Sequence, residues 1–333
     1  MLPRPPLKLP THPPLREDGK AGPLGPAFPG LIKNLKGLRV GVWGRIVSGP
    51  VAQASRLWKP LAPFPQETSF MEIKQGIRRN FARRAASYDR YAGTQRLMAQ
   101  RLMALMEEFV PRAARILEIG CGTGYLTWQL QQANPAARVV ALDLDMALVD
   151  AARRRLGPDS GVAWLVADGE TWSRGCFDLI VANAVFQWLT RPGATLAVYF
   201  ESLAPGGVLA FSTLGPRTFQ ELGASLRQAA NGLNLTVVPE IPAQGFLAKE
   251  SWGGLLGQAG FLKTRLTQEL MTVTFPTVRD FLKSLQATGA TNPQPRAFAP
   301  RLLKALVAAY ETGFGHNGSI PVTYEIILAA ARK

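Results

Sequence analysis

The stretch Leu117–Thr127, LEIGCGTGYLT, decides the fold because three glycines follow an apolar run at alternate positions. The run 114–120, ARILEIG, is typical of a buried β-strand, so the glycines stand at the turn that follows it. Glycine adopts positive φ at low cost, and without a Cβ it lets a ligand lie against the peptide plane. The helix predicted after the turn offers unpaired N–H groups to a carboxylate. We therefore expect a bound ligand at this turn.

Further segments of similar apolar character alternate with helical patterns along residues 71–333. Short buried strands separated by helices predict an α/β fold, with a parallel sheet and helices on both faces. In such a sheet the ligand lies beyond the carboxyl ends of the strands, where the glycine turn stands. The predicted strands after the first are 137–145, 162–168, 176–184, 206–214, 264–275 and 320–331.

The spacing of the glycines differs from the dinucleotide fingerprint GxGxxG. The third glycine, Gly124, comes one residue earlier than that fingerprint requires, and the bulky Tyr125 follows it. A nicotinamide-dependent oxidoreductase is therefore disfavoured, although it stays open as an alternative.

An acidic residue ends each of the first three predicted strands: Glu118, Asp143 and Asp168. Asp143 comes 23 residues after Gly120, about where a carboxylate accepts hydrogen bonds from both hydroxyls of a ribose. The alternative role for Asp143 is that of a helix N-cap. The three acids together favour a nucleoside ligand.

The amino-acid composition indicates which cellular compartment and which kind of partner the protein has. The chain has 38 Lys and Arg residues against 23 Asp and Glu residues, a formal charge of +15, which favours an acidic partner without identifying it. Its two cysteines build no disulfide framework, which indicates a reduced, cytoplasmic protein. No apolar run reaches the roughly 18 residues that a membrane helix needs, so we expect no membrane span.

A change of composition near Met71 predicts a domain boundary. Residues 1–70 hold 13 of the 26 prolines, and we expect them to be a basic, largely disordered extension that is dispensable. Residues 71–333 then form one domain. Within it we expect an N-terminal helical lid at 71–110 and helical insertions at 215–250 and 277–318.

Four motifs resemble the class I S-adenosylmethionine-dependent methyltransferases: ExGxGxG at 118–124, Asp143, ADGE at 167–170 and LAPGG at 203–207. The resemblance implies a Rossmann-like sheet of seven strands with the last one antiparallel, S-adenosylmethionine as cofactor and no metal. It implies that Glu118 organises the amino end of the cofactor, Asp143 the ribose, and Asp168 with Gly169 the adenine. The cofactor-binding residues expected from it are Glu118, Gly120, Cys121, Gly122, Gly124, Asp143, Leu144, Asp168, Gly169 and Asn183.

Three more stretches together look like the malonyl-acyl-carrier-protein O-methyltransferases of biotin synthesis: 77–99, 182–196 and 211–222. The likeness implies methyl transfer to the free carboxylate of a malonyl thioester, giving the methyl ester that primes pimeloyl synthesis. Residues 185–195, VFQWLTRPGAT, depart from the family, which more often carries an acid after the tryptophan. A methyltransferase for another small carboxylate, resembling the trans-aconitate enzyme, stays open as an alternative.

This reaction needs positioning more than acid–base chemistry, because a carboxylate with a pKa near 4 is already ionised at neutral pH. Tyr88 in the SYD motif is expected either as a lid residue or as an ordinary core tyrosine. Trp188 is expected either to exclude water or to pack in the core, and Arg217 to bind the malonyl carboxylate or a phosphate of the carrier. The candidate substrate residues are Tyr88, Gln187, Trp188, Ser212, Thr213 and Arg217.

The implied partner is malonyl-loaded acyl carrier protein, or malonyl coenzyme A, and we expect a monomer. Carrier proteins are acidic, so we expect docking at Arg78, Arg79, Arg83 and Arg84, whereas the run 153–155 is interpreted as a solvated helix face. A nucleic-acid-binding protein is a further alternative, but the sequence lacks RNP, zinc-finger and helix-turn-helix motifs. We therefore expect no nucleic-acid partner.

Overall fold

The computed structural model describes residues 74–76, 78–80, 85–172, 175–239, 241–287 and 299–333. The chain divides into two units, 1–63 and 64–333, and every described residue belongs to the second. The extension predicted at 1–70 and the docking residues Arg83 and Arg84 lie outside the described residues.

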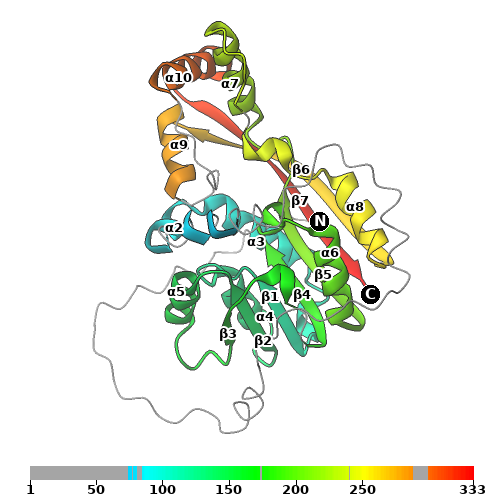
Figure 1. Cartoon of the computed structure of the whole chain (residues 1–333). Helices are drawn as coiled ribbons and strands as arrows, with labels where there is room; N and C mark the ends of the chain where they lie inside the picture. The colour runs from blue at the N-terminus through cyan, green and yellow to red at the C-terminus, as the bar shows by residue number, and fades with distance from the viewer. Residues whose placement is uncertain (1–73, 77, 81–84, 173–174, 240, 288–298) are drawn as a thin grey trace, which may run out of the picture. The chain divides into compact units, whose positions relative to one another are not determined.

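A single sheet organises the described part of the chain (Figure 1). Its order is β3-β2-β1-β4-β5-β7-β6, and β1 to β5 pair in parallel, whereas β7 is antiparallel to both of its neighbours. The predicted seven-stranded, mostly parallel sheet with an antiparallel last strand is therefore confirmed. The strands are β1 (Arg115–Ile119), β2 (Arg138–Asp143), β3 (Ala163–Val166), β4 (Phe177–Asn183), β5 (Leu203–Leu214), β6 (Lys263–Phe275) and β7 (Ile320–Arg332).

The two last strands differ in burial because they hold different places in the sheet. β7 lies between β5 and β6, and nearly all its residues are buried, including the polar Thr323 and Glu325. β6 lies at the edge and is mostly exposed, with alternating partly buried residues along its second half. The two strands pair along their whole length, from Lys263 opposite Arg332 to Phe275 opposite Ile320.

Helices cover both faces of the sheet and enclose two apolar cores. On one face α3, α4 and α5 contribute Leu102, Leu130 and Val149 to the first core. On the other face α6 and α8 contribute Tyr199 and Trp252 to the second. These helices are α3 (Gly93–Leu105), α4 (Tyr125–Ala133), α5 (Met146–Leu156), α6 (Pro192–Ser202) and α8 (Lys249–Gln258).

Three more helices gather around the long ends of β6 and β7 (Figure 1). Phe281 of α9 and Tyr310 of α10 are fully buried there, and Phe281 packs its ring 5.3 Å from that of Phe219. These helices are α7 (Gln220–Gly232), α9 (Val278–Ala287) and α10 (Pro300–Phe314). The remaining helical segments are α2 (Ala85–Tyr91), η3 (Val110–Arg112), η4 (Gly169–Thr171), η5 (Phe186–Trp188) and η6 (Pro242–Gly245). Within the described residues, no helix combines the length and apolar character required to cross a membrane.

Candidate functional site

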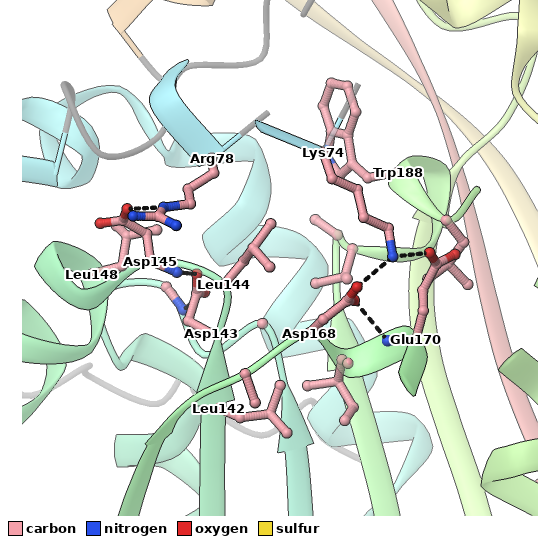
Figure 2. A pocket seen from close by; sticks show the side chains of 18 of the residues that line it. Lys74, Arg78, Leu142, Asp143, Leu144, Asp145, Leu148, Asp168, Glu170 and Trp188 are labelled. Carbon is pink, nitrogen blue, oxygen red and sulfur yellow. Dashed lines mark hydrogen bonds and ion pairs between the residues drawn. The ribbon is translucent and has the colours of Figure 1, made fainter. Parts of the chain in front are cut away.

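A cavity opens at the carboxyl ends of the first strands, beside the glycine turn (Figure 2). Its empty space, including the part open to solvent, is about 890 Å³. The residues predicted from sequence that line it are Tyr88, Gly120, Gly122, Asp143, Leu144, Asp168, Gly169, Asn183 and Trp188.

The glycines of the turn serve two different purposes. A Cβ added at Gly122, where φ is +53°, would meet nothing within 4 Å, so this residue presents bare backbone to open space. Gly124 does not line the cavity: a Cβ there would come within 2.9 Å of Ala152 Cβ on α5. Gly122 therefore leaves room for a ligand, whereas Gly124 lets α5 pack against the turn.

Asp143 ties the turn to the end of β2. Its carboxylate accepts hydrogen bonds from the backbone N–H of Gly122 at 2.9 Å and of Asp145 at 3.1 Å. Burial raises the pKa of Asp143 to about 6, although these backbone donors oppose the shift. Asp143 is not a helix N-cap, because Asp145 caps α5 by accepting from Ala147 N at 2.8 Å. The Asp143 carboxylate lines the cavity and has lone pairs available for hydroxyl donors.

Glu118 is buried on β1, next to the turn, with 1% of its surface exposed. Its Oε2 has no hydrogen-bond partner among the described residues. Burial raises the pKa of Glu118 to about 8; the Thr127 hydroxyl opposes this shift and the Asp143 carboxylate adds to it. Glu118 does not itself line the cavity. A buried carboxyl oxygen without a partner is unfavourable, and a ligand cation held at the glycine turn would satisfy it.

Asp168 stands at the end of β3 and caps η4, accepting from Glu170 N at 3.0 Å. The Lys74 ammonium donates to Asp168 Oδ2 at 2.5 Å and also pairs with the Glu170 carboxylate (Figure 2). No local sequence pattern indicates Lys74, since 94 residues separate it from Asp168. Asp145, which also lines the cavity, could have been found from its N-cap position before the helical pattern.

The polar candidates after β4 and β5 bond to one another. Ser212 Oγ donates to Asn183 Oδ1 at 2.7 Å, and Asn183 Nδ2 donates to Gln95 O at 3.0 Å. Thr213 Oγ1 donates to Gln187 Oε1 at 3.1 Å. Ser212 and Thr213 are fully buried and do not line the cavity, so they support Asn183 and Gln187 from behind.

Three other predicted residues lie apart from the open space. Arg217 is exposed, does not line the cavity, and donates through Nε to Gln220 Oε1 at 3.4 Å. Cys121 is buried in the turn, and burial raises the pKa of its thiol. Gln187 does not line the cavity, although its neighbour Trp188 does. The Trp188 ring meets Phe246 edge to face, with the ring centroids 6.2 Å apart.

The N-terminal helical residues reach the same cavity. Tyr88 lines it, and burial, together with the Asp143 and Asp89 charges, raises the pKa of the Tyr88 phenol above its ordinary value. Arg78 Nε donates to Asp145 Oδ2 at 3.3 Å, whereas Arg79 is exposed.

The run 153–155 is exposed along its whole length, as expected of a solvated helix face, and two of its arginines also form ion pairs. Arg155 pairs with Asp89 on α2, while Arg153 pairs with Asp150 of its own helix at 3.9 Å.

Comparison with known proteins gives one consistent family. Residues 117–209 match the family described as "Methyltransferase domain". A malonyl-acyl-carrier-protein O-methyltransferase of Anoxybacillus flavithermus is 38% identical over 257 residues, covering 76% of this chain and 95% of the relative. One of Halalkalibacterium halodurans is 35% identical over 266 residues, covering 76% and 96%. The solved phosphoethanolamine N-methyltransferase 2 of Haemonchus contortus is 16% identical with a TM-score of 0.47, covering 75% of this chain and 56% of that one.

Proposed function

The chain belongs to the malonyl-acyl-carrier-protein O-methyltransferase family, and on this premise we propose that it methylates the free carboxylate of a malonyl thioester. The product is a methyl ester whose charge is masked. S-adenosylmethionine is the methyl donor. The reaction is the one that primes pimeloyl synthesis for biotin in this family.

The observation that carries the proposal is the buried Glu118 carboxyl next to the glycine turn, whose Oε2 has no hydrogen-bond partner among the described residues. An ammonium group would satisfy Glu118, and the Asp143 carboxylate is available for ribose hydroxyls. Asp168 has an acceptor oxygen for an exocyclic amine at the end of β3. These three groups fit the amino, ribose and adenine parts of the cofactor, which supplies an electrophilic methyl group when it is bound.

The described residues provide positioning and exclude water. The substrate carboxylate is ionised at neutral pH, so no side chain has to remove a proton from it. Trp188 and Tyr88 line the cavity and are suited to covering the reacting groups. Holding the two reactants in line can lower the activation free energy by up to roughly 7 to 11 kcal/mol.

The charges around the cavity agree with a carboxylate nucleophile. The two basic side chains that line it in the described part of the chain, Lys74 and Arg78, are both paired with carboxylates. Arg217 lies away from the cavity, so we do not assign it to the reacting carboxylate. A free cation gripping that carboxylate would weaken it as a nucleophile. We propose that neutral groups around Asn183 and Trp188 receive it instead.

The positive net charge of the domain supports an acidic protein as the partner. Residues 71–333 carry 28 basic and 20 acidic residues, a net +8, which favours an acidic carrier protein. Arg79 is exposed next to the cavity-lining Arg78 and is our docking residue. The two described cysteines are free thiols, which supports a reducing compartment such as the cytoplasm.

The decisive experiment offers labelled S-adenosylmethionine with malonyl carrier protein, malonyl coenzyme A and free malonate in parallel. We expect label in the protein-bound or coenzyme-bound thioester and little in free malonate. Labelling of free malonate or another small dicarboxylate at a higher rate would contradict the proposal.

A further inference from the structure

Glu170 is a buried carboxylate that lines the cavity, and the proposed reaction gives it no role. Its side chain is 4% exposed. Glu170 Oε1 accepts from Thr190 N at 2.5 Å and from Arg191 N at 3.0 Å, and Oε2 accepts from the Thr190 hydroxyl at 2.7 Å. Burial raises the pKa of Glu170, but these donors and Lys74 outweigh it, so that the pKa lies below its ordinary value. Glu170 is therefore an anion held in one place.

Glu170 joins walls of the cavity that are distant in sequence. It belongs to η4, directly after Asp168 and Gly169, which line the cavity. Thr190 and Arg191 end the loop 184–191, which carries the lining residues Trp188 and Leu189. The Glu170 carboxylate thus fixes this loop, the Trp188 loop, against the end of β3.

Lys74 links a third part of the cavity lining to η4 and the Trp188 loop. Its ammonium bridges the Asp168 and Glu170 carboxylates, and its side chain is only 19% exposed (Figure 2). By contrast, Arg78 remains 61% exposed at its ion pair with Asp145. A partly buried lysine between two carboxylates is better shielded from salt and water than a surface pair. Glu170 gives this lysine an anchor that does not itself have to bind the ligand.

We propose that Lys74 and Glu170 form a positioning pair that holds residues 74–76 and the Trp188 loop against the nucleoside end of the bound cofactor. This inference rests on the proposed function, because the nucleoside is that of S-adenosylmethionine. When a nucleoside amine shares Asp168, Lys74 keeps its bond to Glu170 and the segment stays in place. The pair therefore retains the ligand by slowing its release.

The test measures dissociation of S-adenosylhomocysteine from the full chain by stopped-flow displacement. We expect Lys74→Met and Glu170→Gln each to speed dissociation about tenfold, because loss of a closing contact acts mainly on the off-rate. The double variant should dissociate no faster than the faster single variant, since residues acting as one pair are not additive. Lys74→Arg should restore slow release. The matched controls Lys249→Met and Glu250→Gln break an exposed pair at 3.6 Å outside the cavity and should change nothing.

The possible results test the proposed function and the positioning pair separately. A wild-type chain that does not bind S-adenosylhomocysteine overturns the proposed function. Binding by the wild type with unchanged off-rates in Lys74→Met overturns the positioning pair alone, as do fully additive effects. Unfolding temperatures of the ligand-free variants serve as the check for a merely structural role: that of Lys74→Met should stay close to the wild-type value, whereas Glu170→Gln should lower it, because Glu170 accepts three hydrogen bonds from Thr190 and Arg191. If Glu170→Gln fails to fold, Lys74→Met and Lys74→Arg decide the question.

Discussion

The Thr123 hydroxyl donates a hydrogen bond to Asp89 Oδ1 at 2.6 Å, so helix α2 is tied directly to the glycine turn. The other oxygen of the Asp89 carboxylate pairs with Arg155 at the end of α5. One carboxylate therefore joins three segments around the cavity, next to Tyr88, which lines it.

Replacing Asp89 should weaken cofactor binding, because the neighbouring Tyr88 would be held less firmly in the cavity wall. We expect Asp89→Ala to lower the affinity for S-adenosylhomocysteine about fivefold, because it removes a charge-assisted hydrogen bond and an ion pair. Asp89→Asn keeps an acceptor for Thr123 and should lose less. Calorimetry would measure both, with the exposed Asp159→Ala as control. Equal affinity of Asp89→Ala and wild type would show that α2 is held without this contact.

The raised pKa of Glu118, about 8, makes the ligand-free protein sensitive to alkaline pH. The folded pKa lies above the unfolded one, so the stabilisation is fully present below the unfolded pKa near 4.5 and is lost as pH rises through 8. The loss over this whole range is on the order of 5 kcal/mol. We expect the ligand-free unfolding temperature to fall between pH 4.5 and about 8.

Glu118→Gln should remove this dependence, raise the unfolding temperature at high pH and abolish tight ligand binding. Thermal unfolding across the pH series measures the first two effects and calorimetry the third. Glu107→Gln, at an exposed position, is the matched control and should follow the wild type. A variant with the wild-type pH profile would mean that Glu118 is ionised in the ligand-free protein.

Gly122 and Gly124 should respond differently to alanine. Gly122→Ala places a methyl group in open space, so we expect at least a tenfold loss of ligand affinity with about 1 to 2 kcal/mol of backbone strain. Gly124→Ala drives its methyl group to within 2.9 Å of Ala152 Cβ, and overpacking adds about 1 to 3 kcal/mol to the strain. Urea unfolding and calorimetry on both variants would separate the effects. A larger loss of stability in Gly122→Ala than in Gly124→Ala would contradict the roles assigned to the two glycines.

Arg79 should contribute to binding of the carrier protein and not to binding of the cofactor. We expect Arg79→Ala to lower kcat/KM for malonyl carrier protein about threefold and to leave S-adenosylhomocysteine affinity unchanged, since rim charges act mainly on association. Rising ionic strength should lower turnover on the carrier protein more than on malonyl pantetheine. Identical salt dependence for both substrates would argue against electrostatic docking.

A chain that begins at Met71 should keep its cofactor affinity. The described cavity residues begin at Lys74, and relatives are matched over 95% of their length by 76% of this chain. Calorimetry on the truncated and full chains makes the comparison, with thermal unfolding to show that the shorter chain is folded. A folded truncated chain without affinity for S-adenosylhomocysteine would assign a binding role to residues 1–70.

The sheet, the glycine turn and the carboxylates at the strand ends could be predicted from local patterns of residues. Apolar runs and turns are local patterns, and parallel strands bring their carboxyl ends to one edge. Asp143 and Asp168 therefore reach the same cavity whatever the details of packing.

Which other side chains reach that cavity depends on the packing of the folded chain. Lys74 meets Glu170, Asp89 meets Thr123, and Gly124 packs against Ala152, although long stretches of chain separate each pair. The same packing leaves Arg217 outside the cavity and Ser212 behind Asn183. These contacts depend on how whole helices pack across the sheet, which no local pattern of residues specifies.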